Sequence, residues 1–525
     1  MSPARARLAA GAAASAAAFA LVARVAWPWA ALCWVVLVPW LAAADRARTV
    51  GSALAAGLLM AVGFALAVFP WFASAIAAYT GAPWALALLV LVLLAPVLEP
   101  QLVAVALARH AARRTGGGRR RVGVASVCAY VGAEWAVPKL FGDTLGQGLF
   151  ASRLWRQGAD LAGTAGLTLV VVAGNELALA AARALRGGRP RSALVPVAGI
   201  AALALGLAGY GTMRCRQIDA AARAAAPVTV GVVQADISQY DRLRAELGTF
   251  EAVRQILDAH FALSSEVLDR GGIDLLVWPE TVYPTTFGAP KSADGAAFDR
   301  DIAGFAAAMG VPLVFGAYDV EGDDEFNAAV FLEPAAEGRV TFATYRKARL
   351  FPLTERVPAL LGSAAVRRVL PWLGSWKPGA GRDVIPVTLR DGRRLRVAPL
   401  ICYDAVDPDL VRAAVRRGAD AIVTLSNDSW FAAGAGPRLH LVVSAFRSIE
   451  TRRPQVRATN TGISAVISPA GDLLATAGVG ERAALVARVV PAGGASTPWL
   501  AGGDWLGPAA LAAAIALLAW RRRVV

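Results

Sequence analysis

Long apolar runs separated by short arginine-rich segments dominate the first part of the chain. A helix needs about 20 mostly apolar residues to cross the hydrocarbon core of a bilayer. Runs near that length occur at 8–24, 27–43, 50–72, 83–108, 122–139, 164–185, 194–213 and 504–520. The pattern predicts a membrane domain over residues 1–215 with seven transmembrane helices. It also predicts, within 500–525, a final transmembrane helix and a cytoplasmic tail.

The pattern changes over residues 227–495, where shorter apolar runs alternate with amphipathic stretches. The β-branched run at 228–234 is typical of a buried strand. Further strands are predicted at 273–278, 312–318, 395–401, 419–426 and 463–468, and helices at 240–270, 294–310, 408–418 and 437–452. Pro-rich and Gly-rich stretches at 371–381 and 491–508 indicate loops. The alternation predicts a layered α/β domain with its functional residues at strand ends.

The arginines predict how the membrane part is oriented. They gather at Arg46 and Arg48, at 109–121, at 183–191 and at 521–523. With eight spans, all four basic ends and the N-terminus fall on one side, which the positive-inside rule makes cytoplasmic. The domain over 227–495 is then expected on the extracytoplasmic side of the membrane.

Composition narrows the function classes. Hydrophobic residues make up 57% of the 525 residues and charged residues only 17%, which is too apolar for an ordinary soluble enzyme. The net charge of +15 comes from arginines between apolar runs, so it indicates membrane topology rather than nucleic-acid binding. The four cysteines and three histidines show no metal-ligand spacing, so we expect neither a metal nor a cofactor.

Three residues in the α/β region carry candidate chemistry: Glu280, Lys347 and Cys402. Each follows a β-like run. A cysteine attacks as its thiolate, so it needs a base to take its proton, a role that Glu280 fits. Lys347 fits the stabilisation of an oxyanion, helped by the backbone N–H after Cys402. Each residue alone has a simpler structural interpretation: the cysteine is typical of a small core residue, the glutamate of a turn and the lysine of a solvated surface. Their combination favours a thiol acyl-transfer site.

The neighbours of these residues carry a family resemblance. The stretches are Val277-Trp-Pro-Glu-Thr281, Tyr345-Arg-Lys-Ala-Arg-Leu350, Ile401-Cys-Tyr-Asp404, Ser426-Asn-Asp-Ser-Trp-Phe431 and Arg457-Ala-Thr-Asn-Thr-Gly462. In this order they resemble the nitrilase, or carbon–nitrogen hydrolase, superfamily and, within it, its membrane-embedded branch, the apolipoprotein N-acyltransferases. Weaker matches at Glu134-Trp135 and from Gln157 to Asn175 extend the resemblance into the predicted spans.

The resemblance implies a fold and a reaction. The fold is a multi-span α-helical membrane domain plus an α/β nitrilase-like αββα sandwich. Cys402 takes an acyl chain from a phospholipid, expected to be phosphatidylethanolamine, as a thioester, with Glu280 as base and acid and Lys347 at the oxyanion. The chain then passes to the α-amine of a diacylated apolipoprotein, outside the bacterial inner membrane. Glu355 matches a second family glutamate, and Tyr403 supplies the N–H of the oxyanion hole.

One departure and two other functions remain open. The family usually has Glu where this chain has Asp404, one methylene shorter, so any hydrogen bond of that carboxylate must be rebuilt.

The same residues would serve a membrane-bound amidase or nitrilase-type hydrolase with water as acceptor. Eight spans argue against this hypothesis, because one or two spans are enough to tether a hydrolase to a membrane. The third hypothesis for the function is a transporter or a non-catalytic scaffold that kept the fold.

Overall fold

The computed structural model describes residues 3–237, 240–357, 363–370, 374–431, 434–491 and 496–519. It divides the chain into two compact units. The helical unit comprises Met1–Gln217, Phe431–Phe446 and Thr497–Val525, and the α/β unit comprises Ile218–Trp430 and Arg447–Ser496. The helical unit therefore includes a segment from the middle of the sequence as well as both ends.

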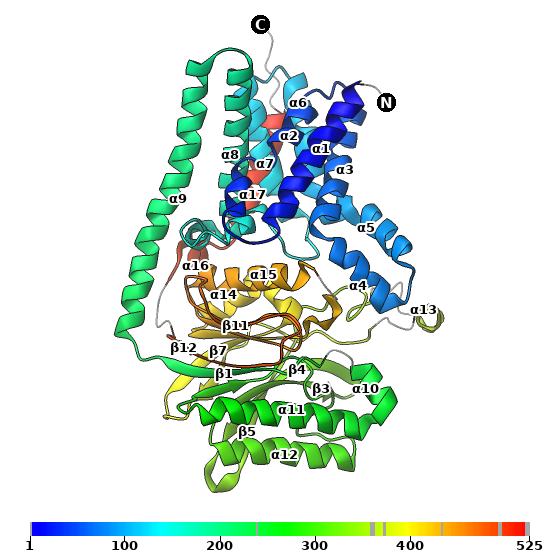
Figure 1. Cartoon of the computed structure of the whole chain (residues 1–525), viewed down its shortest axis with the longest axis vertical. Coiled ribbons are helices and arrows are strands. Elements are labelled where there is room, and N and C mark those ends of the chain that lie inside the picture. Colours follow the sequence, from blue (N-terminus) through cyan, green and yellow to red (C-terminus); the bar gives the residue numbers. More distant parts are fainter. Residues whose placement is uncertain are drawn as a thin grey trace. The chain divides into compact units, whose positions relative to one another are not determined.

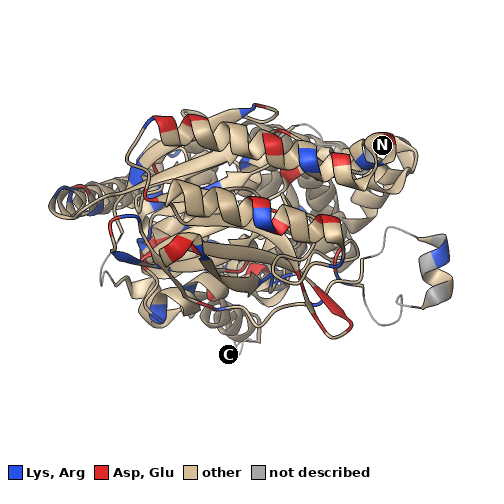
Figure 2. Ribbon diagram, turned by 90° about the horizontal axis from the view of Figure 1, so that it is seen from below, with Lys and Arg blue, Asp and Glu red and all other residues tan. Residues whose placement is uncertain are grey.

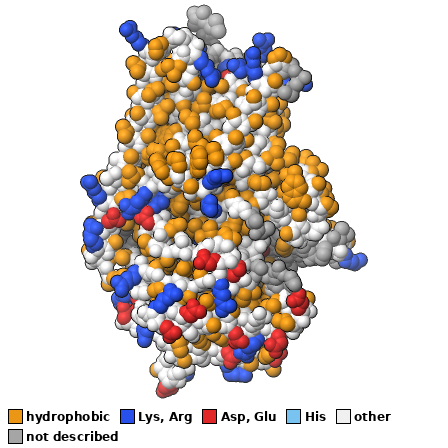
Figure 3. All heavy atoms as spheres, viewed as in Figure 1, with side chains coloured by type: hydrophobic (Ala, Val, Ile, Leu, Met, Phe, Trp, Pro, Cys, Tyr) orange, Lys and Arg blue, Asp and Glu red, His pale blue; other side chains and the backbone are white. Residues whose placement is uncertain are grey.

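Apolar helices build the helical unit (Figure 1). They are α1 (Pro3–Val22), α2 (Val38–Ala44), α3 (Val50–Val68), α4 (Pro70–Thr80), α5 (Trp84–Leu98), α6 (Pro100–Arg114), α7 (Arg119–Ala136), α8 (Ala159–Arg186), α9 (Pro190–Ala224), α16 (Pro498–Gly502) and α17 (Leu506–Ala519). Short 3-10 turns lie at Trp29–Trp34, Leu145–Leu149 and Trp155–Gly158. Figure 3 shows hydrophobic side chains spread over the surface of this unit, as expected of a protein that meets lipid.

Four of the described helices are long and apolar enough to cross a membrane: α1, α3, α8 with the turn before it, and α9. Helices α5 and α6 add a fifth if they count as one span, because they meet at a bend of 53°. By their length and composition these helices are those expected of a membrane protein. The count of eight spans and the domain limits 1–215, 227–495 and 500–525 stay predictions.

Prolines explain two differences from the predicted helices. The stretch 27–43 is not a single helix but the turn Trp29–Trp34 followed by α2, whose first turn holds Pro39. The stretch 83–108 is broken at Glu99, directly before Pro100. Proline lacks an N–H and its ring clashes with the preceding turn, so it fits a helix start and interrupts a longer helix.

A buried ion-pair cluster joins three of the predicted basic ends. The Arg109 side chain, 1% exposed, donates to Asp45 with Nη2 at 2.7 Å and also pairs with Glu176 on α8. Arg113 and Arg183 pair with Asp45 as well. The ends of α2, α6 and α8 therefore lie together, which supports the prediction that these arginines share one side of the membrane. The fourth basic end, 521–523, lies outside the described residues.

Two six-stranded sheets form the α/β unit. The first runs in the order β12-β1-β2-β3-β4-β5 and the second in the order β11-β10-β9-β8-β7-β6. The strands are β1 (Val228–Gln234), β2 (Leu275–Val277), β3 (Leu313–Glu321), β4 (Asp324–Pro334), β5 (Val340–Arg346), β6 (Ile385–Thr388), β7 (Arg394–Ile401), β8 (Ala421–Ser426), β9 (Gln455–Thr459), β10 (Ser464–Ile467), β11 (Leu473–Ala477) and β12 (Ala483–Val489). β1, β2 and β3 run parallel, as do β7, β8 and β9.

The two sheets pack face to face. One buried cluster contains side chains of both sheets, among them Val230, Phe331, Val397 and Val456. A second cluster lies between the first sheet and the helices α11 (Thr249–Asp269) and α12 (Ala293–Met309). Further helices of this unit are α10 (Tyr240–Leu247), α13 (Ala364–Val369) and α14 (Pro408–Arg416). The helix α15 (Gly436–Thr451) is shared, because its residues up to Phe446 belong to the helical unit. Figure 2 shows acidic and basic residues along the helices of the α/β unit. The predicted nitrilase-like α/β fold is confirmed.

All six predicted strands are present, and so are the predicted helices, with 240–270 divided into α10 and α11 at Gly248. The strands β4, β5, β6, β9, β11 and β12 were not predicted. Several of them have exposed positions, for example on β6 and β11, and so lack a continuous apolar run. The predicted loop over 491–508 contains the short helix α16 and the start of α17.

Candidate active site

Glu280 lies just beyond the carboxyl end of β2, two residues after the buried Trp278. The Trp278 indole N–H donates to the Ser264 hydroxyl of α11 at 2.8 Å, which anchors the segment. The Glu280 carboxylate is 5% exposed and accepts three hydrogen bonds. Asn327 Nδ2 (2.8 Å) and Lys347 Nζ (3.1 Å) donate to Oε1, and the Asn427 N–H donates to Oε2 at 2.7 Å. A buried carboxylate held in this way is oriented for proton transfer.

Lys347 follows β5, and its backbone N–H continues the ladder by donating to the Asn327 carbonyl at 2.8 Å. Its side chain is 2% exposed, with Nζ between Glu280 Oε1 at 3.1 Å and Glu355 Oε1 at 2.6 Å. Burial alone lowers the pKa of Lys347, but Glu280 and Glu355 outweigh burial and hold this pKa well above its usual range. The lysine is therefore a fixed cation between two carboxylates.

Cys402 is the first residue after β7 and begins the 3-10 turn Cys402–Val406. Its φ of +47° is unusual for a residue with a side chain and turns the chain sharply at the strand end. Burial, reinforced by the charge of Glu280, raises the pKa of the Cys402 thiol well above its usual value, while Lys347 lowers it in part. The resting sulfur is a neutral thiol, so an attack by sulfur must be coupled to proton removal.

The fully buried Asp404 links the Cys402 segment to the Lys347 segment. Its Oδ2 accepts from the Ile401 N–H and from the Tyr345 hydroxyl, both at 2.9 Å. Its Oδ1 accepts from the N–H groups of Ala348 (3.1 Å) and Arg349 (2.7 Å). The shorter carboxylate thus reaches four donors on both sides of the site.

Asp404 makes the free energy of unfolding depend on pH. Burial raises its pKa to about 6 from the ordinary 3.8, although the donors Arg349 and Ile401 lower it in part. Between roughly pH 4 and pH 6 the folded state therefore binds this proton more tightly than the unfolded chain does. The resulting stabilisation is complete below about pH 4 and is lost as pH rises through about 6.

We expect the unfolding temperature of the wild type, measured relative to Asp404→Asn, to fall from pH 4 to pH 6 and to level off above pH 6. Thermal unfolding of both proteins in one detergent, across that range, measures this difference. A difference that is constant with pH would contradict the assignment.

Glu355 and Tyr403 complete the sequence-predicted set. Glu355 accepts from Lys347 through Oε1 and from the Phe351 N–H through Oε2 at 2.7 Å, so it ties the loop after β5 to the lysine. The Tyr403 ring packs edge-on against Phe351, with ring centroids 5.1 Å apart, and burial raises its pKa to about 12. The structure therefore brings Glu280, Lys347 and Glu355 into direct contact, and it places Cys402, Tyr403 and Asp404 on one turn.

Sequence reasoning did not single out Asn327 and Asn427 as site residues, although both donate to Glu280. A signal for Asn327 was available, because it is the polar residue within the otherwise apolar run Phe326–Leu332 of β4. The loop of Asn427 is fixed by a fully buried pair: Arg457 Nη2 lies 2.9 Å from Asp428 Oδ2. In the sequence, Arg457 and Asp428 stand out only as members of the family motifs.

Gly316 on β3 provides the space for Glu280. A Cβ at this position would lie 2.3 Å from the Thr281 nitrogen and 2.6 Å from Glu280 Cα, and these backbone atoms have little freedom to move. We therefore expect Gly316→Ala to displace Glu280 and to lower kcat/KM about 100-fold, the usual effect of a misplacement near 1 Å.

The matched control is Gly304→Ala on α12, where a Cβ would meet nothing within 4 Å. It should leave activity at the wild-type value and leave the unfolding temperature the same or slightly higher, since alanine favours a helix over glycine. Wild-type kcat/KM in Gly316→Ala would show that the position of Glu280 does not limit the reaction.

Comparisons with known proteins agree with this geometry. The family model described as carbon-nitrogen hydrolase matches residues 229–498. The model described as apolipoprotein N-acyltransferase N-terminal domain matches residues 12–177. The chain is 29% identical to the apolipoprotein N-acyltransferase of Bdellovibrio bacteriovorus, an alignment that covers 85% of this chain and 81% of that protein.

Two further relatives carry the same name. The protein of Geobacter metallireducens is 27% identical, over 94% of this chain and 92% of its own length. That of Caulobacter vibrioides is 31% identical, over 71% and 66%. Among solved structures, an amidase from Nesterenkonia sp. is 23% identical, with a TM-score of 0.36, over 50% of this chain and 90% of its own.

Proposed function

Because this chain belongs to the carbon–nitrogen hydrolase family and, within it, to the apolipoprotein N-acyltransferases, we propose that it transfers an acyl chain from a phospholipid to the N-terminal α-amine of a diacylated lipoprotein. The observation that carries the proposal is the buried contact of Glu280 and Lys347 beside the turn of Cys402, in a chain whose apolar helices match the N-terminal domain of that branch. A soluble hydrolase has no need of those helices.

In the first half-reaction, Glu280 takes the proton of the Cys402 thiol as the sulfur attacks the carbonyl carbon of the donor ester. The negative oxygen of the tetrahedral intermediate is stabilised by the Lys347 ammonium and the Tyr403 N–H. The carbon–oxygen bond then breaks, Glu280 returns the proton to the leaving alkoxide, and a lysophospholipid departs. The acyl chain remains on sulfur as a thioester.

In the second half-reaction, the α-amine of diacylglyceryl-cysteine attacks the thioester carbonyl. Glu280 accepts a proton from the amine, and Lys347 again faces the oxyanion. The carbon–sulfur bond then breaks, and Glu280 gives that proton to the departing sulfur, which returns the Cys402 thiol and the Glu280 carboxylate. Because water would compete with the amine, this chemistry requires a site that excludes water. A site supplied with lipid at a bilayer surface meets this requirement.

The finer parts of the proposal concern donor and place. The donor is phosphatidylethanolamine, and the α/β unit faces the periplasmic side of the bacterial inner membrane. The cluster of Arg109, Arg113 and Arg183 around Asp45 supports the orientation, since it collects basic ends of the helical unit where the positive-inside rule expects the cytoplasm.

The competing function is a membrane-bound hydrolase that uses the same residues with water as acceptor. The discriminating experiment incubates the purified protein with phospholipid and a synthetic diacylated lipopeptide. The proposal predicts that the lipopeptide gains one acyl chain on its α-amine. Release of free fatty acid, with the lipopeptide unchanged, would establish the hydrolase instead.

A further inference from the structure

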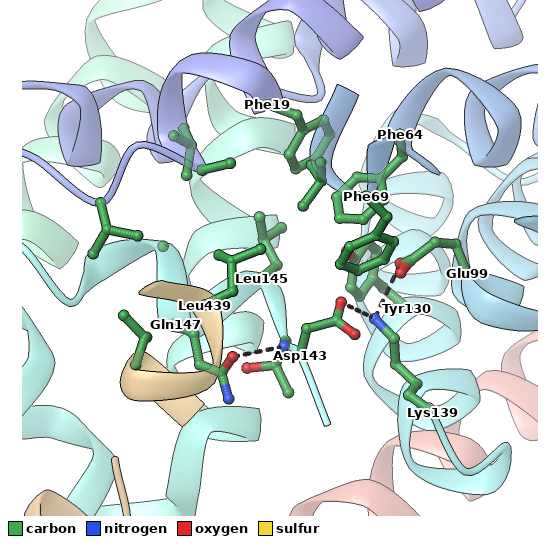
Figure 4. Close-up of a pocket in the computed structure, with 17 residues that line it drawn as sticks. Phe19, Phe64, Phe69, Glu99, Tyr130, Lys139, Asp143, Leu145, Gln147 and Leu439 are labelled. Atoms are coloured by element: carbon green, nitrogen blue, oxygen red, sulfur yellow. Dashed lines mark hydrogen bonds and ion pairs between the residues drawn. The ribbon is translucent and has the colours of Figure 1, made fainter. Parts of the chain in front are cut away.

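The helical unit contains a cavity of about 70 Å³ with one apolar and one charged end (Figure 4). The rings of Phe19, Phe64 and Phe69 line the apolar part. Glu99 and Lys139 line the charged end, together with Asp143. Glu99 lies at the break between α5 and α6, where Pro100 ends the first helix and the two axes bend by 53°.

The charged end has one internal cation and two carboxylates. Lys139 Nζ donates to Glu99 Oε2 at 3.0 Å and to Asp143 Oδ2 at 2.6 Å. Gln101 Nε2 donates to the same Glu99 oxygen at 2.5 Å. The Glu99 side chain is 1% exposed and that of Lys139 5% exposed. With both carboxylates ionised, the three charged side chains carry a formal charge of −1.

Two buried oxygens of the described residues at this end are acceptors without a donor, whereas the Thr144 hydroxyl, which also lines the cavity, can donate as well as accept. Among the described residues, Glu99 Oε1 and Gln101 Oε1 are buried and have no hydrogen-bond partner. A buried acceptor without a donor costs free energy, most of all when it belongs to a carboxylate. A ligand that completes this site must therefore bring N–H or O–H donors, and a positive charge would balance the excess carboxylate.

We propose that this cavity binds the primary ammonium group of a lipid, with the ammonium donating to Glu99 Oε1 and the adjoining carbons lying against the phenylalanine rings. A water needs roughly 10–15 Å³ on the same measure of volume, so the cavity takes an ammonium with a few carbons but not a whole lipid. A phosphate does not fit, because Lys139 is engaged by two carboxylates. A trimethylammonium group does not fit either, because it has no N–H to donate.

Two amphiphiles share this chemistry: an ethanolamine phospholipid and a lipid-anchored peptide with a free α-amine. The proposed site consists of residues of the helical unit and includes none of Glu280, Lys347 and Cys402. The proposal therefore does not depend on the proposed acyl transfer. Binding is therefore measured in the full-length Cys402→Ala protein, where acyl transfer cannot occur.

The probe is hexylammonium, titrated by calorimetry into the protein in detergent, with hexyltrimethylammonium as the comparison ligand. We expect hexylammonium to bind at least about ten-fold more tightly, since hydrogen bonds to charged groups are the stronger ones. Glu99→Gln should abolish this preference. The matched control is Glu176→Gln, at a carboxylate that pairs with Arg109 and does not line the cavity, and it should keep the preference. Equal binding of the two probes, or a preference that survives Glu99→Gln, would overturn the proposal.

The variant Lys139→Met tests whether the cavity selects a positively charged ligand. This test remains available if the Glu99→Gln variant does not fold. Loss of the internal cation frees both carboxylates, so hexylammonium affinity should be kept or increased, and a decrease would overturn the proposal.

A competition experiment then identifies which lipid supplies the ammonium group. Displacement of the probe by short-chain phosphatidylethanolamine, or by a diacylated lipopeptide, but not by their N-acetylated forms, supports one lipid or the other. Displacement by neither would overturn a lipid ligand.

Discussion

Replacing Cys402 with alanine is expected to lower the rate of lipopeptide acylation by about 10⁴-fold or more, the usual consequence of removing a covalent nucleophile. The fold should survive, because alanine fills most of the same buried position at the end of β7. The rate is measured by mass spectrometry of the lipopeptide. In the absence of acceptor, the intact mass of the wild type should rise by one acyl group, and that of Cys402→Ala should not.

The matched control is Cys128→Ala, which removes a half-buried cysteine of α7 and should leave the rate unchanged. Acylation by Cys402→Ala at more than a tenth of the wild-type rate, or an acyl adduct on another cysteine, would rule out the assigned nucleophile. Loss of activity in both variants would point to a general effect of removing cysteine.

Replacing Lys347 with methionine is expected to produce two separate losses. The oxyanion loses its cation, which should reduce kcat about 10²–10³-fold. Glu280 and Glu355 also lose the ammonium between them, and breaking a buried ion pair by removing one partner typically costs about 3–5 kcal/mol of stability. Lys377→Met, at an exposed lysine paired with Asp324, should change neither quantity.

The double variant Lys347→Met with Glu355→Gln separates the two losses. Removing the charge of Glu355 relieves the unpaired carboxylate, so part of the lost unfolding temperature should return. Activity should not return, because no cation then faces the oxyanion. Recovery of kcat together with stability would show that Lys347 acts only by holding the fold.

Glu280 and Cys402 were predictable because they follow the apolar runs of β2 and β7, which were predicted as strands. Lys347 was predictable from its neighbours in sequence, whereas the strand before it, β5, is mostly exposed and was not among the predicted strands. The contacts among the three residues were not predictable from spacing, since they depend on which strands pair. Asn327 reaches Glu280 because β4 pairs antiparallel with β3, which itself lies next to β2, and β4 was absent from the predicted strands. The need for glycine at Gly316 likewise arises from the close approach of the Glu280 backbone.

The membrane part shows the same limit. Apolar length located most of its helices, but it could not show that new helices begin at Val38, directly before Pro39, and at Pro100. Nor did the sequence indicate that Phe431–Phe446 belongs to the helical unit, because its helical pattern continues directly into residues of the α/β unit. Local pattern predicts elements, whereas tertiary packing decides how they are grouped.

The most direct test of the central claim follows the acyl group itself. Purified protein is loaded with labelled phospholipid, freed of excess donor, and mixed with a diacylated lipopeptide in a single turnover. The account predicts that label leaves Cys402 and appears on the α-amine of the peptide in equal amount. Label that appears as free fatty acid, at a rate independent of the peptide, would contradict it.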